Sequence, residues 1–369
     1  MESIALPVYF LTLLLLGVFS YGFIDPNLTL SANQTFVRLQ APLKNLVYHQ
    51  RPEATIIFLV LLLLMFACYV YFLKSPPKFF VIVFSACILV FSYPALTYDV
   101  FNYIATAKVA LAYRENPYVV MPIEIPNEPN LAFTRAANKV ALYGPVWIAL
   151  TSIPHYLGGG NVWRTIIAFK LINTLVYLGF SYFIFRVTKN LTNVVFFALN
   201  PLVLIEVLMN GHNDIYMMIL AIGGLLLWQR NLKAYGFLLL AASWFIKGAT
   251  IILAPLLFLK NISRERLLLI AYCLLSFVFF VVAPIREELY PWYAVWLVMT
   301  ASLLPMKKHK YLILFTIVLT FALELRNLPY MWMGYYEGPG PALRFALTVI
   351  PVVLYAGYIG FRYLAKRKV

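Results

Sequence analysis

The sequence predicts an all-α polytopic membrane protein, and three observations support this prediction. The chain of 369 residues is 63% hydrophobic and only 12% charged, with a mean hydropathy of +0.83, whereas the surface of a soluble domain needs more charge. The apolar residues form continuous runs separated by short polar turns, which favours helices over the alternating pattern of a transmembrane barrel. The basic residues lie in short clusters between these runs, as the orientation of membrane helices requires.

The apolar runs predict about twelve spans, since ~20 apolar residues are needed to cross the bilayer core. The first run, residues 4–24, lacks a basic leading segment and a small-residue cleavage site, so we expect a retained span and not a signal peptide. The expected spans are residues 3–24, 53–73, 79–97, 165–186, 191–209, 214–229, 233–247, 249–260, 266–284, 293–305, 310–324 and 342–364.

One transmembrane domain, residues 1–369, is expected to hold all of these spans. Its three parts are an N-terminal part with a polar loop at 25–52, a core, and a group of C-terminal helices, at residues 1–74, 75–305 and 306–369.

The longest region without a span is residues 98–164, within the core. Its apolar stretch 146–157 is too short to cross a bilayer comfortably. We expect a helix that lies on the membrane surface there.

Basic residues at alternate turns, such as Lys74 and Lys78 or Lys307 and Lys308, mark the cytoplasmic side. This alternation holds only if residues 146–157 do not cross, and it then places both termini in the cytoplasm. We expect the protein to lie in the cell membrane of a prokaryote, surrounded by membrane lipids. The net charge of +15 is spread over the turns, so no nucleic-acid partner is expected.

Asp99 is the first candidate functional residue, because it is one of only fourteen acidic residues and stands where a span meets water. An ionisable group at that position suggests a functional site. The alternative is that Asp99 caps the helix that follows it.

The run Asn210-Gly211-His212-Asn213-Asp214 is the second candidate, since it packs four polar side chains into one outer turn. Asn213 or Asp214 could simply cap the next helix. The other interpretation is that the turn presents polar groups and a helix N-terminus to an anion such as phosphate.

Two cations at the outer face are candidates for binding phosphate. Lys247 is a lone charge in apolar sequence, followed by Gly248; it either reaches up to the interface or neutralises a lipid phosphate. Arg286 offers a guanidinium, which matches phosphate geometry. Trp292 and Tyr293 are either interfacial anchors or part of the site.

One carboxylate base beside a cationic phosphate site suits glycosyl transfer from a lipid-linked sugar phosphate. The phosphate is the leaving group and needs positive charge, and the acceptor hydroxyl needs one base. The three cysteines, Cys68, Cys87 and Cys273, lie inside apolar runs and predict no disulfide framework or metal site. We therefore expect no metal and no cofactor.

The chain also resembles a known family, through motifs between Thr97 and about Pro305. It resembles the GT-C superfamily of integral-membrane glycosyltransferases, most closely its polyprenyl-phosphate-mannose branches: the bacterial α-1,6-mannosyltransferases and the enzyme that adds the first mannose to GPI-anchor precursors. The motifs are Asp99-Val-Phe…Asn116-Pro-Tyr118, Tyr143-Gly-Pro145, Asn200-Pro201, Asn210-Gly-His-Asn-Asp214, Phe245-Ile-Lys247 and Tyr290-Pro-Trp-Tyr293.

The resemblance implies a GT-C-like bundle with surface-lying helices in the long outer loop, and a catalytic carboxylate at Asp99. It implies a polyprenyl (dolichyl-type) phosphate sugar as donor, mannose as the sugar, and transfer with inversion to a glycan, glycolipid or protein. Some relatives have an adjacent acidic pair where this chain has one acidic residue. The expected donor-phosphate contacts are Lys247, Arg286 and His212. The expected substrate contacts are Tyr98, Asn102, Asn116, Tyr118, Tyr143, Asn210, Asn213, Asp214 and Tyr293.

The main rival hypothesis is a transporter or flippase for a glycolipid or lipid-linked sugar. Transporters of this kind show repeated halves and polar sites near the middle of the membrane. Here the polar groups gather at one face and no repeat is visible, which favours the enzyme. A receptor or scaffold without catalysis is a second rival.

Overall fold

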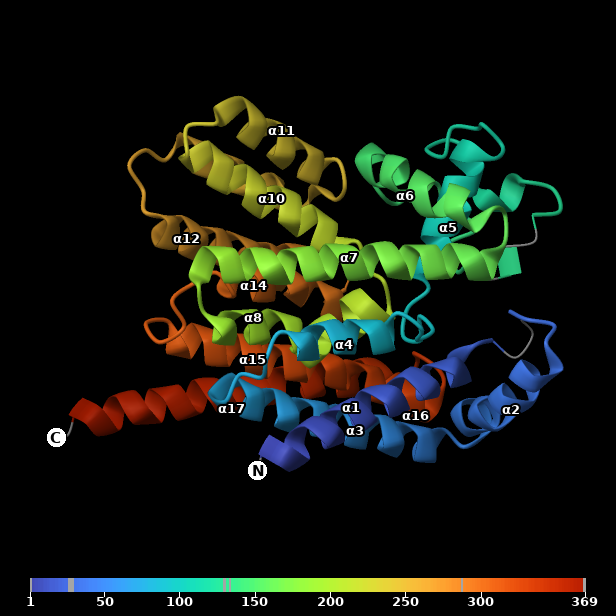
Figure 1. Ribbon diagram of the computed structural model, residues 1–369, viewed down its shortest axis with the longest axis horizontal. Coiled ribbons are helices and arrows are strands. Elements are labelled where there is room, and N and C mark those ends of the chain that lie inside the picture. Colours follow the sequence, from blue (N-terminus) through green and yellow to red (C-terminus); the bar gives the residue numbers. More distant parts are fainter. Residues whose placement is uncertain (1, 26–29, 129–130, 133, 287, 368–369) are drawn as a thin grey trace.

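A computed structural model describes residues 2–25, 30–128, 131–132, 134–286 and 288–367. Every regular element in these ranges is a helix, and most of the long helices run side by side (Figure 1). The chain is therefore an all-α membrane protein, as its continuous apolar runs predict.

The number of spans is smaller than the sequence predicts. In the described ranges, six helical stretches are long and apolar enough to cross a membrane, or seven if the bent pair Leu191–Ala198 and Pro201–Met209, which meet at 51°, counts as one span. The six are Ile4–Phe23, Arg51–Lys74, Val162–Thr188, Arg264–Ile285, Lys310–Met333 and Gly340–Arg362.

Five further apolar runs form helices that are too short for this criterion. They are α4 (Phe80–Leu89), α10 (Asp214–Gln229), α11 (Lys233–Trp244), the 3₁₀ helix η5 (Gly248–Phe258) and α14 (Ala294–Ala301). An α-helix rises about 1.5 Å per residue, so a ten-residue helix covers about half of the hydrocarbon layer. The prediction of about twelve spans is thus not supported, because apolar composition does not fix the length of each helix.

The N-terminal part packs α1 (Glu2–Ser20) against α3 (Arg51–Lys74) and α4. The predicted polar loop between the first two spans contains a helix, α2 (Gln34–His49), which the sequence analysis missed. Asn33 caps it by accepting hydrogen bonds from the amides of Thr35 and Phe36. This helix packs on the short helix η1 (Tyr21–Phe23) and on α3.

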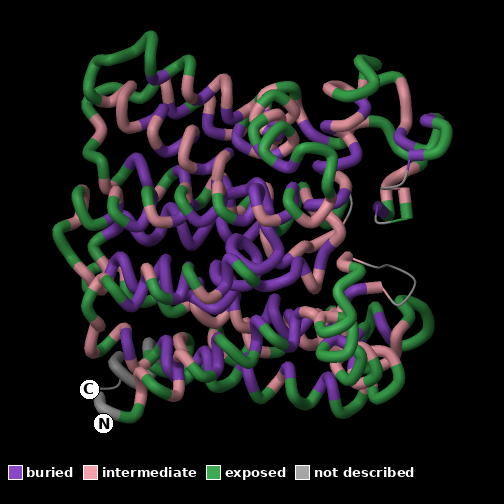
Figure 2. The backbone as a smooth tube through the Cα atoms, turned by 45° about the vertical axis from the view of Figure 1, so that its right-hand side comes forward, coloured by how far each residue is buried: buried purple, intermediate pink, exposed green. Residues whose placement is uncertain are grey.

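The centre of the molecule is the segment 193–215, in which every residue is buried. It comprises most of α8 (Leu191–Ala198), α9 (Pro201–Val203), the π-helix η4 (Leu204–Met209) and the turn into α10. Around it lie α7 (Val162–Thr188), α14 and α15 (Lys310–Glu324). Figure 2 shows the buried backbone concentrated in the middle of the bundle.

One end of the bundle carries the region that follows the third apolar run. There, α5 (Asp99–Leu111), the 3₁₀ turn η2 (Pro122–Glu124) and α6 (Pro145–Gly158) gather on the right of Figure 1. Helix α6 packs along α5 and α7. At the opposite end α1 begins and α17 (Gly340–Arg367) ends.

The remaining elements are one long helix and several short ones. They are α12 (Arg264–Phe277), the π-helix η6 (Val278–Val282), α13 (Ala283–Arg286), η7 (Pro291–Tyr293), η8 (Leu325–Asn327) and α16 (Leu328–Met333).

Candidate active site

The turn that carries His212 is shaped by a π-helix and a glycine. Helix η4 ends with a bond from the amide of Asn210 to the carbonyl of Ile205 (2.7 Å), and the amide of His212 reaches the carbonyl of Glu206 (3.0 Å). Gly211 has a φ of +80°, a conformation that costs a residue with a Cβ about 1–2 kcal/mol. The extra residue per turn of a π-helix and the glycine together place the histidine ring beside the start of α5.

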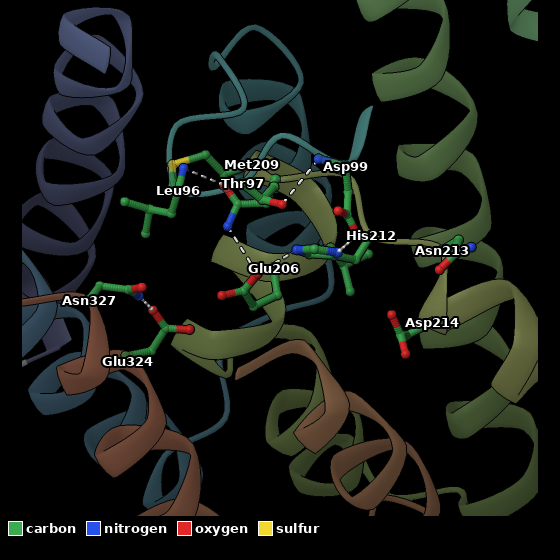
Figure 3. A network of polar contacts seen from close by, with 12 residues as sticks. Leu96, Thr97, Asp99, Glu206, Met209, His212, Asn213, Asp214, Glu324 and Asn327 are labelled. Carbon is green, nitrogen blue, oxygen red and sulfur yellow. Dashed lines mark hydrogen bonds and ion pairs between the residues drawn. The ribbon is translucent and has the colours of Figure 1, made fainter. Parts of the chain in front are cut away.

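Asp99 is the first residue of α5, and Tyr98 occupies the N-cap position. The amide of Asp99 donates to the hydroxyl of Thr97 (3.2 Å). The Asp99 carboxylate lies toward His212 (Figure 3). The helix therefore begins at Asp99 while its carboxylate is used in tertiary contacts.

His212 lies between the carboxylates of Asp99 and Glu206, and this triad forms the centre of the site (Figure 3). Its Nδ1 is 3.2 Å from Oδ2 of Asp99, and its Nε2 is 3.1 Å from Oε2 of Glu206. The side chain of His212 is fully buried and that of Glu206 is 2% exposed, but that of Asp99 is 20% exposed. Of the three, Asp99 is the group that a ligand can reach.

The two carboxylates decide the charge of the histidine. Burial lowers the pKa of His212, but the hydrogen bonds and charges of Asp99 and Glu206 outweigh it and raise this pKa to about 9. Burial raises the pKa of Asp99, but the hydrogen bond and charge of His212, the charge of Lys247 and a hydrogen bond with Tyr143 lower it overall. At neutral pH the site thus holds an ionised Asp99 against a charged imidazole.

Titration of the histidines in ¹⁵N NMR spectra is expected to show one of the four, His212, losing its proton near pH 9. A raised pKa in the folded state means that the stabilisation is complete below the ordinary value of about 6.5 and is lost as the pH rises through about 9. Replacing Glu206→Gln removes one of the two carboxylates and should lower this midpoint. A wild-type midpoint near 6.5 would contradict the charged triad.

Asn210 links the segment that leads into α5 to the turn that holds His212. Its Oδ1 accepts from the amide of Leu96 (3.2 Å), and its Nδ2 donates to Oε2 of Glu206 (3.0 Å). The side chain is fully buried. It therefore fixes the chain that enters α5 relative to the carboxylate behind His212.

Two tyrosines cover the other side of Asp99. The Tyr103 hydroxyl donates to Oδ2 of Asp99 over 3.5 Å and accepts from the amide of Asn213 (3.3 Å). The ring of Tyr143 lies edge-on to the ring of Tyr103, with 4.8 Å between centroids. The side chain of Tyr143 also forms a hydrogen bond with Asp99. These contacts hold the Asp99 carboxylate in one orientation.

A second charged pair lies next to the triad. Lys247 Nζ is 3.2 Å from both carboxylate oxygens of Asp214, and Trp296 donates its indole N–H to Oδ1 of Asp214 (2.6 Å). Asp214 is fully buried, whereas the Lys247 side chain is 21% exposed and lies over the ring of Tyr293, 4.6 Å from its centroid. The exposed part of this lysine can meet an anion.

Gly144 brings two sequence motifs together. Its amide donates to the carbonyl of Ile246 (3.1 Å), and the amide of Val146 donates to the carbonyl of Phe245 (3.1 Å). A Cβ at position 144 would stand 2.0 Å from the Phe245 carbonyl oxygen. Only glycine allows this approach, which places Tyr143 and Lys247 in the same site.

Substituting Gly144→Ala is therefore expected to destabilise the protein by about 3 kcal/mol or more, because the clash is with backbone rather than with a movable side chain. The matched control is Gly17→Ala in α1, where a Cβ would have nothing within 4 Å. This substitution should be neutral or should stabilise the protein by ~0.5–1 kcal/mol. The free energy of unfolding in mixed micelles is the measurement. Equal values for the two variants would show that the close approach is not rigid.

Lys170 supports the π-helix from behind. It is 1% exposed, and its Nζ donates to the Ser92 hydroxyl (2.8 Å) and to the carbonyls of Leu208 and Met209. These are the last two carbonyls before the turn that holds His212. The Lys170 amine thus satisfies carbonyls that the end of a helix leaves free.

The other predicted contacts have partners outside the triad. Asn102 accepts from the Thr134 hydroxyl. Asn116 accepts from the amide of Tyr118 (3.0 Å), and the Tyr118 hydroxyl donates to the Tyr143 carbonyl (2.9 Å). Tyr98 lies under the guanidinium of Arg135, 4.9 Å away.

Arg286 and Asn213 are the two predicted residues that remain. The backbone of Arg286 ends α13, but its side chain lies outside the described part of the structure. Asn213 is 1% exposed, and among the described residues neither its Oδ1 nor its Nδ2 has a hydrogen-bond partner. The side-chain amide of Asn213 is thus buried without a partner among the described residues.

Several residues of the site were missed by the sequence analysis. Glu206 and Glu324 are buried carboxylates that interact electrostatically, and Figure 3 shows Glu324 beyond Glu206, on the side away from Asp99. Tyr103 and Lys170 are the others. A carboxylate inside an apolar run, such as Glu206 in Leu204–Met209, is the signal that could have been used. Trp292, assigned either to the interface or to the site, stacks on His212 with 4.1 Å between centroids.

Chemically, this arrangement can accept a proton at Asp99 and hold an anion near Lys247. Comparison with family models gives one match: residues 11–262, more than half of the chain, match the model described as alpha-(1→6)-mannopyranosyltransferase, N-terminal domain. No curated protein and no solved structure gave a significant match.

Proposed function

The chain belongs to the alpha-(1→6)-mannopyranosyltransferase family and is a mannosyltransferase of the GT-C type, and from this premise we propose that it takes mannose from a polyprenyl-phosphate carrier. The acceptor is a hydroxyl on a glycan, glycolipid or protein at the outer face of the membrane. Asp99 is the general base. The buried contact of His212 with Asp99 and Glu206, which leaves only Asp99 within reach of a substrate, supports this proposal best.

The reaction needs one proton transfer and one displacement. The acceptor oxygen attacks the anomeric carbon, its proton passes to Asp99, and the bond to the phosphate oxygen breaks, so the polyprenyl phosphate leaves with the electron pair. Attack opposite to the leaving group inverts the configuration and gives an α-mannoside from a β-linked donor. Asp99 stays ionised for this task because His212 is charged beside it.

Positive charge must meet the leaving phosphate, because negative charge grows there as the bond breaks. The candidates from the sequence are Lys247, His212 and Arg286. Lys247 has an exposed part and interacts electrostatically with Asp99, so it is a candidate close to the base.

The position of the site at one end of the bundle supports the remaining parts of the proposal. Helix α5, which begins at Asp99, and α6 lie at the end opposite to the start of α1 and the end of α17 (Figure 1). With the basic turns in the cytoplasm, both termini are cytoplasmic and the site faces out. Helix α6 then lies at the outer membrane surface.

The direct test uses the full chain in nanodiscs with radiolabelled polyprenyl-phosphate mannose and a range of mannan acceptors. We expect labelled mannose to appear on an acceptor and polyprenyl phosphate to be released in equal amount. Movement of intact donor across the bilayer without release would instead support a flippase. Release with polyprenyl-phosphate glucose but not mannose would overturn the sugar assignment.

A further inference from the structure

We propose that Arg326 and Arg344 form the binding site for the phosphate of the polyprenyl-linked donor, with Glu288 occupying the place of a phosphate oxygen when no donor is bound. This inference rests on the proposed function. Both arginines lie beyond residues 11–262, the part of the chain that matches the family model. They come from η8 and from the first turns of α17.

Both guanidinium groups converge on a single oxygen. Nη2 of Arg326 is 2.7 Å and Nη1 of Arg344 is 2.9 Å from the same Oε1 of Glu288. Guanidinium groups bind phosphate oxygens, like carboxylate oxygens, through charge-assisted hydrogen bonds, so a phosphate oxygen can take the place of this Oε1. The Glu288 side chain is 36% exposed and lies between α13 and η7, so it can move aside.

The two arginines also have donors to spare. Among the described residues, neither the Nε of Arg326 nor that of Arg344 has a hydrogen-bond partner, although both atoms are buried. Arg326 is 6% exposed as a residue. A phosphate offers more acceptor oxygens than a carboxylate, so it can satisfy donors that Glu288 leaves unpaired.

Charge balance favours this pair over the other cations of the site. Lys247 is matched by Asp214, and His212 lies between Asp99 and Glu206. Arg326 and Arg344 together carry two positive charges against the one carboxylate of Glu288. This cluster therefore has an excess of positive charge for an anionic ligand.

Stacked aromatic rings connect the arginines to the base. Arg326 interacts electrostatically with Tyr290, Tyr290 stacks on Trp292 with 4.4 Å between centroids, and Trp292 stacks on His212. Trp292 is covered by a stacked ring on each side, so these rings form a column between the arginines and His212, and the sugar of a donor bound at the arginines can lie along the edges of this column toward Asp99.

The surroundings of Arg344 favour a lipid-linked phosphate over a free one. Only 6% of the most apolar window of α17 is buried within the protein, so this helix presents its surface to the bilayer. Leu343 and Phe345, on either side of Arg344, are exposed. A polyprenyl chain in the bilayer can lie against this apolar surface while its phosphate meets the arginines.

The test measures binding of radiolabelled polyprenyl phosphate to the full chain in phosphatidylcholine nanodiscs. We expect Arg344→Gln to weaken binding at least ~10-fold, because charge-assisted hydrogen bonds are lost. Glu288→Gln should tighten binding several-fold, because a competing carboxylate is removed while both arginines stay. Arg362→Gln, an exposed arginine on the same helix, is the matched control and should bind like the wild type.

The outcomes separate the alternatives. Unchanged binding by folded Arg344→Gln, or weaker binding by Glu288→Gln, would overturn the proposal, since the cluster would then be a structural ion pair. If Arg344→Gln does not fold, the sign of the Glu288→Gln effect decides. Displacement of the label by equal concentrations of inorganic phosphate would overturn the assignment to a lipid carrier.

The proposed function is tested separately from this site. Binding of polyprenyl phosphate that depends on Arg344, in a protein that transfers no mannose, would support the site and reject the reaction. Mannosyl transfer whose donor KM is the same in wild type and Arg344→Gln would support the reaction and reject the site.

Discussion

Substituting Asp99→Asn should lower the rate of mannosyl transfer by about 10²–10⁴-fold, the range that a positioned general base contributes. The amide has the size of the carboxylate but cannot take the proton of the acceptor hydroxyl. Binding of polyprenyl phosphate should remain, because the proposed phosphate contacts are other residues. The measurement is release of polyprenyl phosphate from radiolabelled polyprenyl-phosphate mannose in nanodiscs, with wild type and variant at equal amounts of folded protein.

The control for this experiment is Asp25→Asn. Asp25 is another partly exposed aspartate, 25% exposed, and its carboxylate is 3.8 Å from Arg135, whereas the carboxylate of Asp99 pairs with His212. Its loss should change transfer little, since exposed ion pairs contribute only ~0–1 kcal/mol. Equal transfer by wild type and Asp99→Asn would remove Asp99 as the base. Loss of both transfer and polyprenyl-phosphate binding would assign it to binding instead.

Some of the site could be predicted from the sequence because its residues are rare where they occur. Asp99 and the turn from Asn210 to Asp214 stand out as polar groups between apolar runs. The structure brings Asp99 and His212 together, and it brings Tyr143 and Lys247 together through the backbone contact at Gly144. The glycine in that motif is explained by the carbonyl that it touches.

The parts that could not be predicted depend on local geometry and on distant packing. Nothing in Leu204–Met209 indicates a π-helix, yet that geometry is what turns His212 toward Asp99. The partners of Lys170 come from residues about 40 and 80 positions away along the chain. Helix lengths were overestimated because apolar runs continue through breaks such as Asn200-Pro201, where the chain bends.

The pairing of Lys247 with Asp214 has a consequence for stability that tests its role. Lys247→Met is expected to destabilise the protein by about 3–5 kcal/mol, because it leaves a fully buried carboxylate without its cation. Asp214→Asn should cost less, since the partly exposed lysine can reach water and the new amide can still accept from Trp296. The double variant should recover most of the loss. The free energy of unfolding in mixed micelles gives all four corners of this cycle.

The same cycle separates packing from phosphate binding. If Lys247 contacts the donor phosphate, the double variant will be nearly as stable as Asp214→Asn alone but will need about 10–100-fold more donor, since a hydrogen bond to a charged group contributes ~1.5–3 kcal/mol. If Lys247 only neutralises Asp214, the donor KM will be the same in Asp214→Asn and in the double variant. Additive losses of stability would mean that the two side chains do not interact in the membrane. The sequence alone does not decide whether Lys247 binds the lipid phosphate. Stability and donor KM, measured on Asp214→Asn and on the double variant, decide it independently.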